Sequence, residues 1–439
     1  IKEEFIYLFE IADSLKKKVE AENMDTIFYD IELPMTRILA DMEEKGVVVD
    51  PMFLKRLAKK INGELNTITA SIYKHAGEEF NINSPRQVSH ILFEVLDLET
   101  QGLKKTAKGG VISTGAAELE KLKNSHPIVA QMLNYRELSK LKNTYVDVLP
   151  TLIDSSDGRI HTTFNQTVAS TGRLSSSNPN LQNIPIMSVY GKEIRKSFMA
   201  PSGFLLCSFD YSQIELRVAA HMSGDKKMIE AFQKGLDIHR MTASAIYNIP
   251  LQEVTPEFRR AAKTLNFGIL YGMGAVALSE STGMSRTDAK KFIDEYFREF
   301  AGVRKYLDST RHFAETHGYV ETLFGRRRYI PEIHSSNWQL KREAERMAIN
   351  MPIQGTATGD IVKMAMIALD TWIREHKHED SMRMILQVHD ELIFEIRESE
   401  ARTLIPEIKK TMENIANLKV PLIVDVKIGK NWGEQETRS

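Results

Sequence analysis

Two acidic positions stand at the ends of apolar runs, where a strand would leave them accessible. The run Phe204 to Phe209 ends on Asp210, and a helix-compatible segment follows at once. A second apolar run, starting at Met384, reaches the acid pair Asp390 and Glu391. Carboxylates are the hard ligands that Mg²⁺ prefers, and two ions about 4 Å apart can stabilise both oxygens of a phosphoryl displacement. The acids therefore indicate metal-assisted phosphoryl transfer, although each acid alone is also compatible with a solvated turn.

A helical run lies between these acids along the chain, from Pro256 to Gly272. Within it Arg259, Lys263, Phe267 and Tyr271 recur every four residues, so they advance only about 40° per step and share one stripe. Cations can hold a triphosphate, and flat rings can pack against a sugar and a base. The alternative is that the rings belong to the core and the cations to a solvated face. Taken with the acids, the stripe favours a nucleotide site.

The elements expected to position these groups include both helices and strands. The first 150 residues show mainly helical periodicity, as in Ile31 to Glu44, where apolar residues share one face. The polar segment Ser170 to Pro185 predicts a loop. Strand-like runs occur at Thr162 to Val168, Phe204 to Phe209, Met384 to Val388 and Glu391 to Ile396. The pattern predicts an α+β fold with a small sheet and a turn at His389-Asp390.

Composition sets broad limits. The 439 residues should form about two to four packed units. The 58 basic and 59 acidic residues nearly cancel, so a nucleic-acid surface would require segregated charge. The single cysteine, Cys207, favours a packing role in a reducing compartment. We find no signal peptide and no apolar run of about 18 residues, and expect a soluble, cytoplasmic protein without membrane contact. The chain begins at Ile1, so we expect a fragment of a longer protein.

Three segments carry a resemblance to a known family. Phe209 to Arg217, Arg259 to Gly272 and Gln387 to Glu391 are similar to motifs A, B and C of family A DNA polymerases, the Klenow-type portion of bacterial DNA polymerase I. The similarity runs in order from about Asp25 to the C-terminus. Three long motifs at compatible spacing form a very specific pattern. The resemblance implies a template-directed DNA polymerase that acts in DNA replication or repair.

The same resemblance implies the metal chemistry. Asp210 and Asp390 would be the metal-binding carboxylates, with the backbone carbonyl of Tyr211 as a further ligand and Glu391 as an accessory acid. The cofactor would be two Mg²⁺ ions, for which Mn²⁺ could substitute. The primer 3′-hydroxyl would attack the α-phosphate of a deoxynucleoside triphosphate and release pyrophosphate, which requires positioning and charge neutralisation more than covalent help.

Nucleotide contacts follow from motifs A and B of the family. Arg259 and Lys263 would hold the triphosphate, and Lys263 would also be the acid for pyrophosphate departure. Glu215 would be the steric gate that excludes a 2′-hydroxyl. The further residues that the resemblance places near the nucleotide are His239 at the phosphates, Phe267 on the sugar, Tyr271 by the templating base, and Gln213 of motif A. Phenylalanine at 267, in place of tyrosine, implies poor acceptance of dideoxynucleotides.

The resemblance also implies contacts with primer-template DNA. Minor-groove acceptors occur in every base pair, so donors there can test the shape of a pair without reading sequence. An ordinary solvated-face interpretation remains open for the two cations of the helical arm. The positions expected to contact DNA are Arg346, Asn350 and Gln354 on one helix, Arg173, Asn180 and Gln182 in a loop, His389 at the primer terminus, and Arg136 and Lys140 on the helical arm.

A right-hand architecture follows from the family, with palm, fingers and thumb in a monomer. We expect residues 1–29 to be a remnant helix of a preceding exonuclease-like domain. The expected divisions of the rest are a thumb at 30–150, a first palm part with motif A at 151–224, fingers with motif B at 225–335, and a second palm part with motif C at 336–439.

Some positions depart from the family pattern or imitate other sites. Met187 stands where the family usually has arginine. The segment Gln354 to Asp360 has one residue more than usual, and its glycine favours a bulge in a helix. Asp30 and Glu32 imitate the start of an exonuclease metal site, which we reject because no sequence of exonuclease length surrounds them. The run Arg326 to Arg328 predicts either a phosphate patch or an ordinary surface loop.

Two rival functions remain at this stage. An inactive primer-template binding module would keep basic surfaces and lose a carboxylate, but Asp210 and Asp390 are both present. A single-subunit RNA polymerase would use the same metals, but the combination of Glu215 and Phe267 disfavours it.

Overall fold

A five-stranded sheet forms the centre of the computed structural model, which describes residues 2–106, 110–186 and 188–438. The strand order is β12-β11-β6-β10-β9, and every neighbouring pair is antiparallel. The strands are β6 (Phe204–Tyr211), β9 (Met382–Val388), β10 (Glu391–Arg397), β11 (Val424–Gly429) and β12 (Glu436–Arg438). The predicted runs at 204, 384 and 391 are thus confirmed as strands. Cys207 and Phe209 on β6 are buried in the core of the molecule.

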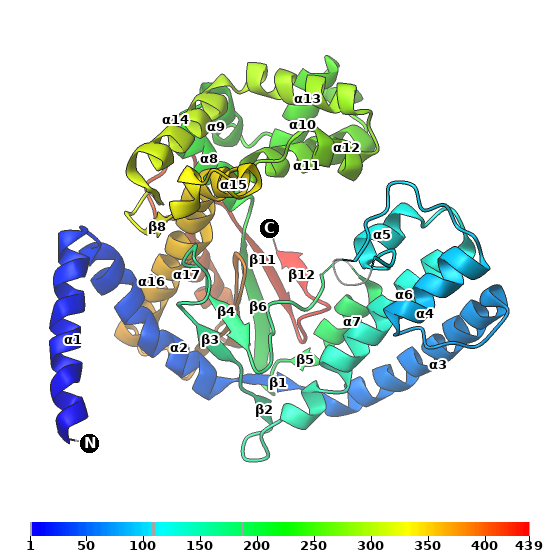
Figure 1. Cartoon of the computed structure of the whole chain (residues 1–439). Coiled ribbons are helices and arrows are strands. Elements are labelled where there is room, and N and C mark those ends of the chain that lie inside the picture. The colour runs from blue at the N-terminus through cyan, green and yellow to red at the C-terminus, as the bar shows by residue number, and fades with distance from the viewer. Residues whose placement is uncertain (1, 107–109, 187, 439) are drawn as a thin grey trace.

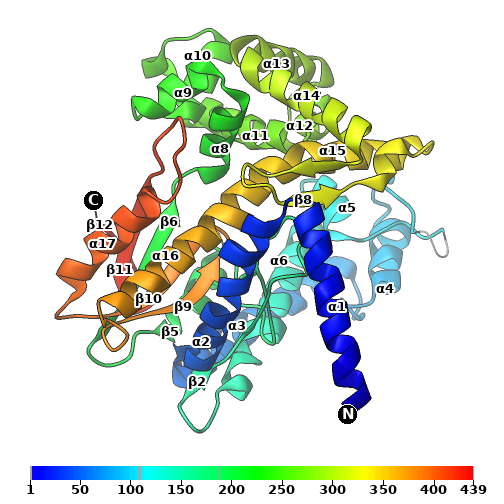
Figure 2. The ribbon, with the colours of Figure 1, turned by 90° about the vertical axis from the view of Figure 1, so that its left-hand side faces the viewer.

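Three helices from distant parts of the sequence lie along the sheet (Figure 2). They are α2 (Leu33–Lys45), α16 (Val362–Glu375) and α17 (Ala401–Glu413). The apolar face of α2 packs against α16 and β9. Two ion pairs across this contact, Arg37 with Asp370 and Arg374 with Asp41, fix α2 to the sheet side of the molecule.

A helical group follows β6 in the chain and lies above the sheet in Figure 1. Within it α10 packs on α11, and α14 packs on both α8 and α15. The members are α8 (Ile214–Ser223), α9 (Lys226–Gln233), α10 (Ile238–Tyr247), α11 (Pro256–Leu270), α12 (Ala275–Thr282), α13 (Arg286–Glu299), α14 (Ala301–His317) and α15 (Trp338–Gln354). The N-cap of α11 is Thr255, with Pro256 in its first turn, so the predicted helix begins where proline is best tolerated.

A second helical group precedes the sheet in the chain and has its own apolar core, including Ile72, Val88, Leu119 and Met132. The long helix of this arm is capped by Asp50, whose carboxylate accepts from the N–H groups of the first turn. The members are α3 (Pro51–Ala76), α4 (Pro85–His90), α5 (Ala116–Lys121) and α6 (Pro127–Leu141), with the short helices η2 (Ile91–Val95), η3 (Lys142–Val146) and η4 (Leu149–Leu152). In Figure 1 this arm lies on the opposite side from α16 and α2.

Smaller elements join these groups. β1 (Val47–Val49) pairs with β2 (Arg159–Ile160) and β5 (Phe198–Met199), β3 (Thr163–Asn165) with β4 (Ser175–Ser177), and β7 (Tyr319–Glu321) with β8 (Arg327–Tyr329). The predicted loop 170–185 therefore contains a short strand, because Ser175–Ser177 pairs with the strand before it. The other short elements are η1 (Thr26–Glu32), α7 (Val189–Lys196), η5 (Leu251–Glu253), η6 (Pro331–His334) and η7 (Gly355–Ile361).

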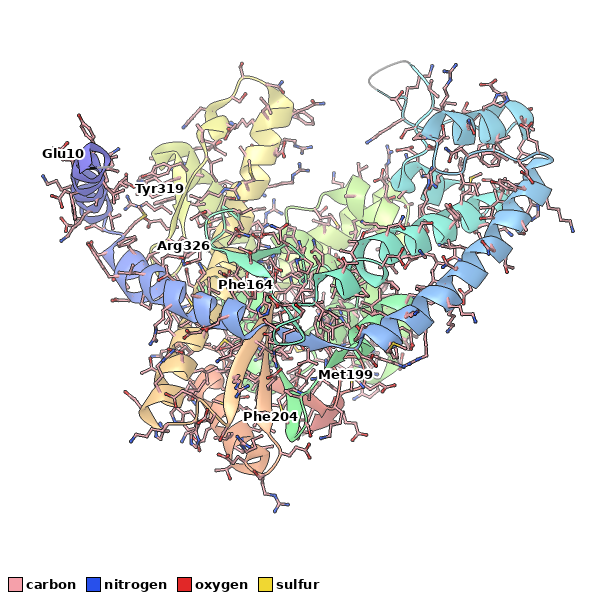
Figure 3. The ribbon with its side chains drawn as sticks, turned by 90° about the horizontal axis from the view of Figure 1, so that it is seen from below. Glu10, Phe164, Met199, Phe204, Tyr319 and Arg326 are labelled. Carbon is pink, nitrogen blue, oxygen red and sulfur yellow. The ribbon has the colours of Figure 1, made fainter. Side chains whose placement is uncertain are left out.

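The first helix, α1 (Lys2–Ala21), extends away from the body of the molecule (Figure 2), and Glu10 lies on it at the edge of the view from below (Figure 3). Its apolar residues Tyr7, Phe9 and Ile11 are exposed. Among the described helices, none is both long enough and apolar enough to cross a bilayer.

Candidate active site

The two acidic positions meet at one edge of the central sheet. Glu391 on β10 lies directly opposite Asp210 on β6 in the antiparallel register. Asp390 stands in the turn between β9 and β10, where His389 takes a positive φ of 59°. The backbone N–H of Tyr211 donates to the carbonyl oxygen of Asp390 at 3.1 Å, which ties this turn to the end of β6. Asp210 and Asp390 consequently line one cavity of about 410 Å³.

Burial and crowded negative charge determine the electrostatics of this pair. Burial raises the pKa of Asp210, and the charges of Asp390 and Glu391 raise it further. Burial likewise raises the pKa of Asp390, and Glu215 and Glu391 add to this effect. Asp425 on β11 lies opposite Asp210 on the other side of β6 and adds more negative charge. Such a group of carboxylates is stabilised by a bound cation.

The donor set suits Mg²⁺. Within residues 2–106, 110–186 and 188–438, no three His, Cys, Asp or Glu side chains form a preformed metal cluster. Mg²⁺ is usually bound through one or two carboxylates together with water and substrate phosphates. Asp210 and Asp390 can supply the two carboxylates. Gln213 also lines this cavity, and its buried Oε1 has no hydrogen-bond partner among the described residues. The residues therefore fit a magnesium site that a phosphate ligand completes.

The stripe expected on 256–272 forms another wall of the same cavity. Arg259, Lys263 and Phe267 on α11 line it, and Tyr271 lines it as the residue that caps this helix. Asp237 accepts a 2.7 Å bond from Nε of Arg259 and holds that cation in place. Phe267 is only partly buried and Tyr271 is 38% exposed, so neither ring is a core side chain.

His239 also lines this cavity, although the residue is only 2% exposed. Burial lowers the pKa of His239 to about 4. The charges of Arg259 and Lys263 also lower this pKa, whereas the charge of Asp237 raises it. Its Nδ1 lies 2.9 Å from the amide nitrogen of Asn266. The imidazole is therefore neutral at pH 7, and it can offer a phosphate a hydrogen bond but no positive charge.

Glu215 stands at the first turn of α8 and is held from two sides. Arg173 donates to its Oε1 at 2.6 Å, and the hydroxyl of Tyr271 donates to its Oε2. The side chain of Gln354, with its oxygen turned toward the guanidinium, accepts from Arg173 at 2.8 and 3.1 Å. Arg173, expected to contact DNA, thus links the proposed sugar gate to α15.

The other two residues of the loop expected to contact DNA, Asn180 and Gln182, make hydrogen bonds within the protein. Gln182 is buried, and its Nε2 donates to both the carbonyl and the side-chain oxygen of Gln387, at 3.1 and 2.9 Å. Gln387 in turn donates to the carbonyl oxygen of His389. Asn180 is exposed, and its side chain accepts from the N–H of Gln182. The loop therefore supports the turn that carries Asp390.

The remaining predicted DNA contacts lie on two helices. On α15, Arg346 is exposed and Asn350 is partly buried. On α6, Lys140 is exposed, whereas Arg136 is partly buried and donates to the carbonyl oxygen of Thr114. Arg136 and Lys140 line an open cavity of about 520 Å³ on the helical arm. Their contact with DNA stays a prediction.

The departures from the family pattern have different structural outcomes. The bulge predicted in 354–360 is confirmed, because this segment forms the π-helix η7. For the run 326–328 the sequence allows both a phosphate patch and a surface loop, and Arg326 fits neither, because its largely buried side chain pairs with Asp360 and Glu32. Because Glu32 pairs with Arg326, its role is structural. Met187 lies outside the described residues.

Comparisons with known proteins decide the family. The profile described as DNA polymerase family A matches residues 51–434. The chain belongs to DNA polymerase family A. This family A chain is 46% identical to the thermostable DNA polymerase I of Thermus thermophilus over 420 residues, 95% of this chain and 50% of that protein. It is 44% identical to DNA polymerase I of Pseudomonas aeruginosa over 422 residues, 96% of this chain and 46% of the relative.

A solved structure supports the same membership. The POL domain of Pol1 from M. smegmatis, in complex with DNA primer-template and dNTP, superposes on this family A chain with a TM-score of 0.90. The two are 41% identical, and the match covers 97% of this chain and 74% of the other. The resemblance inferred from three motifs is thus confirmed, as is a helix-rich fold with small antiparallel sheets. The chain spans about half the length of the curated relatives it matches.

Asp425 and Thr358 also line the cavity and were not among the predicted site residues. Asp425 lies in the alternating run Val424 to Ile428, which predicts a strand but not which strand it pairs with. Thr358 looked like part of a local insertion, and only the fold brings it to Arg173. In the sequence, only the strand pattern around Asp425 could have pointed to that residue.

Proposed function

We propose that this chain is a template-directed DNA polymerase that adds deoxynucleotides to a primer 3′-hydroxyl and releases pyrophosphate. One observation carries the proposal: Asp210 at the end of β6, Asp390 in the β9–β10 turn and the cation–aromatic stripe of α11 line the same cavity. The partners would be primer-template DNA and deoxynucleoside triphosphates, the ligands of the M. smegmatis relative. We place the activity in the cytoplasm, in DNA replication or repair, with the chain acting as a monomer.

The fold supports a right-hand division of the chain. The sheet with α16 and α17 would be the palm, the group α9 to α14 the fingers, and the arm α3 to α6, with its own core, the thumb. The expected thumb began at residue 30. Because α2 packs on α16 and β9, we place residues 30–49 with the palm and begin the thumb at α3. Residues 1–29 would remain from a preceding exonuclease-like domain.

The chain's own groups would orient the reactants. Arg259, held by Asp237, and Lys263 would bind the triphosphate, and Lys263 would deliver a proton to the departing pyrophosphate. The neutral His239 would add a hydrogen bond to a phosphate oxygen. Phe267 would pack on the sugar and hold the α-phosphate in line with the primer hydroxyl, so that most of the rate gain comes from positioning.

The acids would provide the metal site. Asp210, Asp390 and the carbonyl oxygen of Tyr211 would hold Mg²⁺, with Glu391 as an accessory acid and Mn²⁺ as a substitute. When bound, two such ions neutralise charge on the phosphate oxygens and favour ionisation of the attacking hydroxyl. The raised pKa values of Asp210 and Asp390 make binding of the ions depend on pH, since both acids must lose their protons.

Sugar selection and duplex contact would use the neighbouring residues. Glu215 would crowd a 2′-hydroxyl, and Gln213 would contact the nucleotide beside it. Tyr271 would stack near the templating base. The groups proposed to contact primer-template DNA are Arg173, Asn180, Gln182, Arg346, Asn350, Gln354 and His389 near the cavity, and Arg136 and Lys140 on the thumb.

A primer-extension assay with Mg²⁺ tests the proposal. Deoxynucleotides and ribonucleotides are compared on DNA and RNA templates. The expected result is extension on the DNA template with a strong preference for deoxynucleotides. A protein that binds the duplex but extends nothing is an inactive binding module, and one that prefers ribonucleotides is an RNA polymerase; either outcome overturns the proposal.

A further inference from the structure

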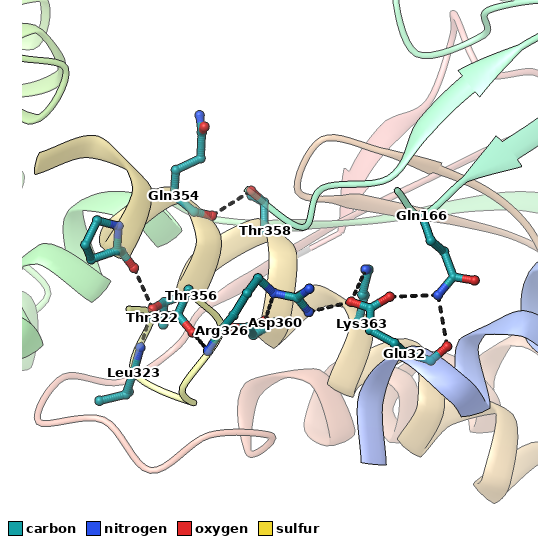
Figure 4. Close-up of polar contacts among 11 residues, drawn as sticks. Glu32, Gln166, Thr322, Leu323, Arg326, Gln354, Thr356, Thr358, Asp360 and Lys363 are labelled. Carbon is teal, nitrogen blue, oxygen red and sulfur yellow. Dashed lines mark hydrogen bonds and ion pairs between the residues drawn. The ribbon is translucent and has the colours of Figure 1, made fainter. Parts of the chain in front are cut away.

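The π-helix η7 contains two threonines whose hydroxyl groups are anchored in the same way. Oγ1 of Thr356 donates to the carbonyl oxygen of Pro352 at 2.6 Å, and Oγ1 of Thr358 donates to that of Gln354 at 2.9 Å (Figure 4). With its hydrogen used, each hydroxyl can only accept from a further neighbour. Thr356 accepts from the backbone N–H of Leu323, at 2.9 Å. Thr358 accepts from Nε of Arg173, at 2.5 Å.

The hydrogen bond between Thr358 and Arg173 belongs to a chain of contacts that ends at Glu215, the proposed sugar gate. Nε of Arg173 is held by Thr358, while a terminal nitrogen of the same guanidinium donates to Oε1 of Glu215. The other oxygen of Glu215 accepts from the hydroxyl of Tyr271. A guanidinium is planar, so fixing Nε also fixes the direction in which its terminal nitrogens point. Thr358 at Nε and Gln354 at the terminal nitrogens thereby set where Arg173 can hold the carboxylate.

The backbone before Arg173 is held from two sides. A Cβ on Gly359 would lie 2.4 Å from the carbonyl oxygen of Thr171, so η7 touches this backbone directly. On the other side, the guanidinium of Arg326 occupies the space where a Cβ on Gly172 would lie. This leaves little freedom for the chain that carries Arg173.

A buried ionic network holds the Arg326 side chain in place against Gly172 (Figure 4). Oδ1 of Asp360 accepts from Nε of Arg326 at 2.7 Å, and Glu32 pairs with both Arg326 and Lys363. Gln166 donates to Glu32 at 2.7 Å. Asp360 lies within η7, Lys363 follows it and Glu32 ends η1, so elements far apart in the sequence meet at the turn before Arg173.

We propose that Thr358 is a positioning residue for sugar discrimination. It orients Arg173 so that Arg173 and Tyr271 together hold the Glu215 carboxylate across the position of the nucleotide 2′-carbon. A gate held by two partners cannot rotate aside without breaking a charge-assisted bond, whereas a loosely held one can yield to a 2′-hydroxyl. The inference rests on the proposed polymerase function. It concerns the segment in which this chain has one residue more than the usual family pattern.

The test compares Thr358→Val with Thr358→Ser, Thr358→Ala and the matched control Thr356→Val. Valine keeps the shape and removes the hydroxyl, serine retains the hydroxyl, and alanine provides a second hydroxyl-free variant should valine fail to fold. Single-nucleotide incorporation gives kcat and KM for a deoxynucleotide and its ribonucleotide on one primer-template with Mg²⁺. The quantity compared is the ratio of the two kcat/KM values.

We expect Thr358→Val and Thr358→Ala to lower discrimination by roughly three- to tenfold, as loss of one hydrogen bond to a charged group implies. The change should come mainly from a lower KM for the ribonucleotide, because a purely structural defect would lower kcat for both substrates. Thr358→Ser should restore the ratio. Thr356→Val should lose thermal stability and keep the ratio, because its hydroxyl contacts Leu323 and not Arg173.

Two failures are distinguishable. If the unmodified chain incorporates no deoxynucleotide, the proposed function itself is wrong. If the unmodified chain polymerises and discriminates, but the hydroxyl-free variants stay within about twofold of its ratio, only the role of Thr358 is refuted. An equal loss of discrimination in Thr356→Val would also refute it, since the effect would then not pass through Arg173.

Discussion

The backbone N–H of Tyr211 donates to the carbonyl oxygen of Asp390, at 3.1 Å, and this one bond joins the two halves of the candidate metal site. It continues the β6–β10 ladder by one step into the turn that carries Asp390. The acids are thus placed by sheet hydrogen bonds, which are stiffer than contacts between surface loops. We expect the site to tolerate little displacement of either strand.

Loss of one carboxylate should stop the chemistry and leave DNA binding intact. Asp390→Ala is expected to lower nucleotide incorporation by about a thousandfold or more, because several kcal/mol of charge stabilisation depend on the acid pair. Single-turnover extension measures the rate, and fluorescence anisotropy with a labelled duplex measures binding. Asp380→Ala, in the exposed turn before β9, is the control and should extend normally. Extension by Asp390→Ala at the parental rate contradicts the metal assignment.

The acids should make the metal-free protein less stable at neutral pH. The folded pKa of Asp210 is raised to about 7, so between about pH 4 and pH 7 the folded state keeps a proton that the unfolded state releases. The free energy of unfolding should therefore fall as pH rises through this window. Asp210→Asn removes the effect and should gain on the order of 2 kcal/mol at about pH 8 without divalent ions, and almost nothing below about pH 4.

Denaturant unfolding at a series of pH values in chelator measures this difference. Asp294→Asn on the exposed face of α13 is the control and should change the free energy of unfolding by less than about 0.5 kcal/mol at any pH. A destabilised Asp210→Asn variant at about pH 8 is the result that our account of the site does not permit. The same variant should be inactive in extension, so stability and function oppose each other here.

The proposed gate, Glu215, should control the choice of sugar more strongly than Thr358. Glu215→Ala is expected to reduce discrimination against ribonucleotides by roughly ten- to a hundredfold, since it removes the side chain proposed to crowd the 2′-hydroxyl. Glu215→Gln keeps the volume and loses the ion pair with Arg173, and its discrimination should lie between alanine and the parent. Competitive incorporation on one template measures all three. Equal discrimination in Glu215→Ala and the parent rules out the gate.

The close approach of η7 to the preceding loop gives a stability prediction. Gly359→Ala would place a Cβ 2.4 Å from the carbonyl oxygen of Thr171, so the backbone must move, at about 1–3 kcal/mol. Gly63 lies inside α3, where a Cβ would have no atom within 4 Å, and Gly63→Ala should stabilise by about 0.5–1 kcal/mol. Thermal unfolding distinguishes these opposite signs. A neutral Gly359→Ala would mean that the contact is loose in solution.

Much of the site could be read from residue types and local periods. The four-residue spacing from Arg259 to Tyr271 predicted one stripe, and the structure places all four side chains on one cavity. Apolar runs ending at Asp210 and Asp390 predicted strands with acids at their ends, which β6 and the β9–β10 turn confirm. The glycine in 354–360 predicted a bulge, and the π-helix η7 confirms it. Each of these predictions depends on close neighbours along the chain.

The tertiary structure decided what these local patterns could not. Sheet register brought Asp425 beside Asp210, and buried ion pairs turned Arg326 from a candidate surface cation into an internal one. The contact of Thr358 with Arg173 joins segments whose order in the chain gives no sign of their meeting. A sequence encodes which face of an element is apolar, but pairing between distant elements depends on the packing of the whole core. The motifs in the sequence therefore indicate the chemistry of this chain, while the contacts that position Glu215 are set only by the tertiary structure.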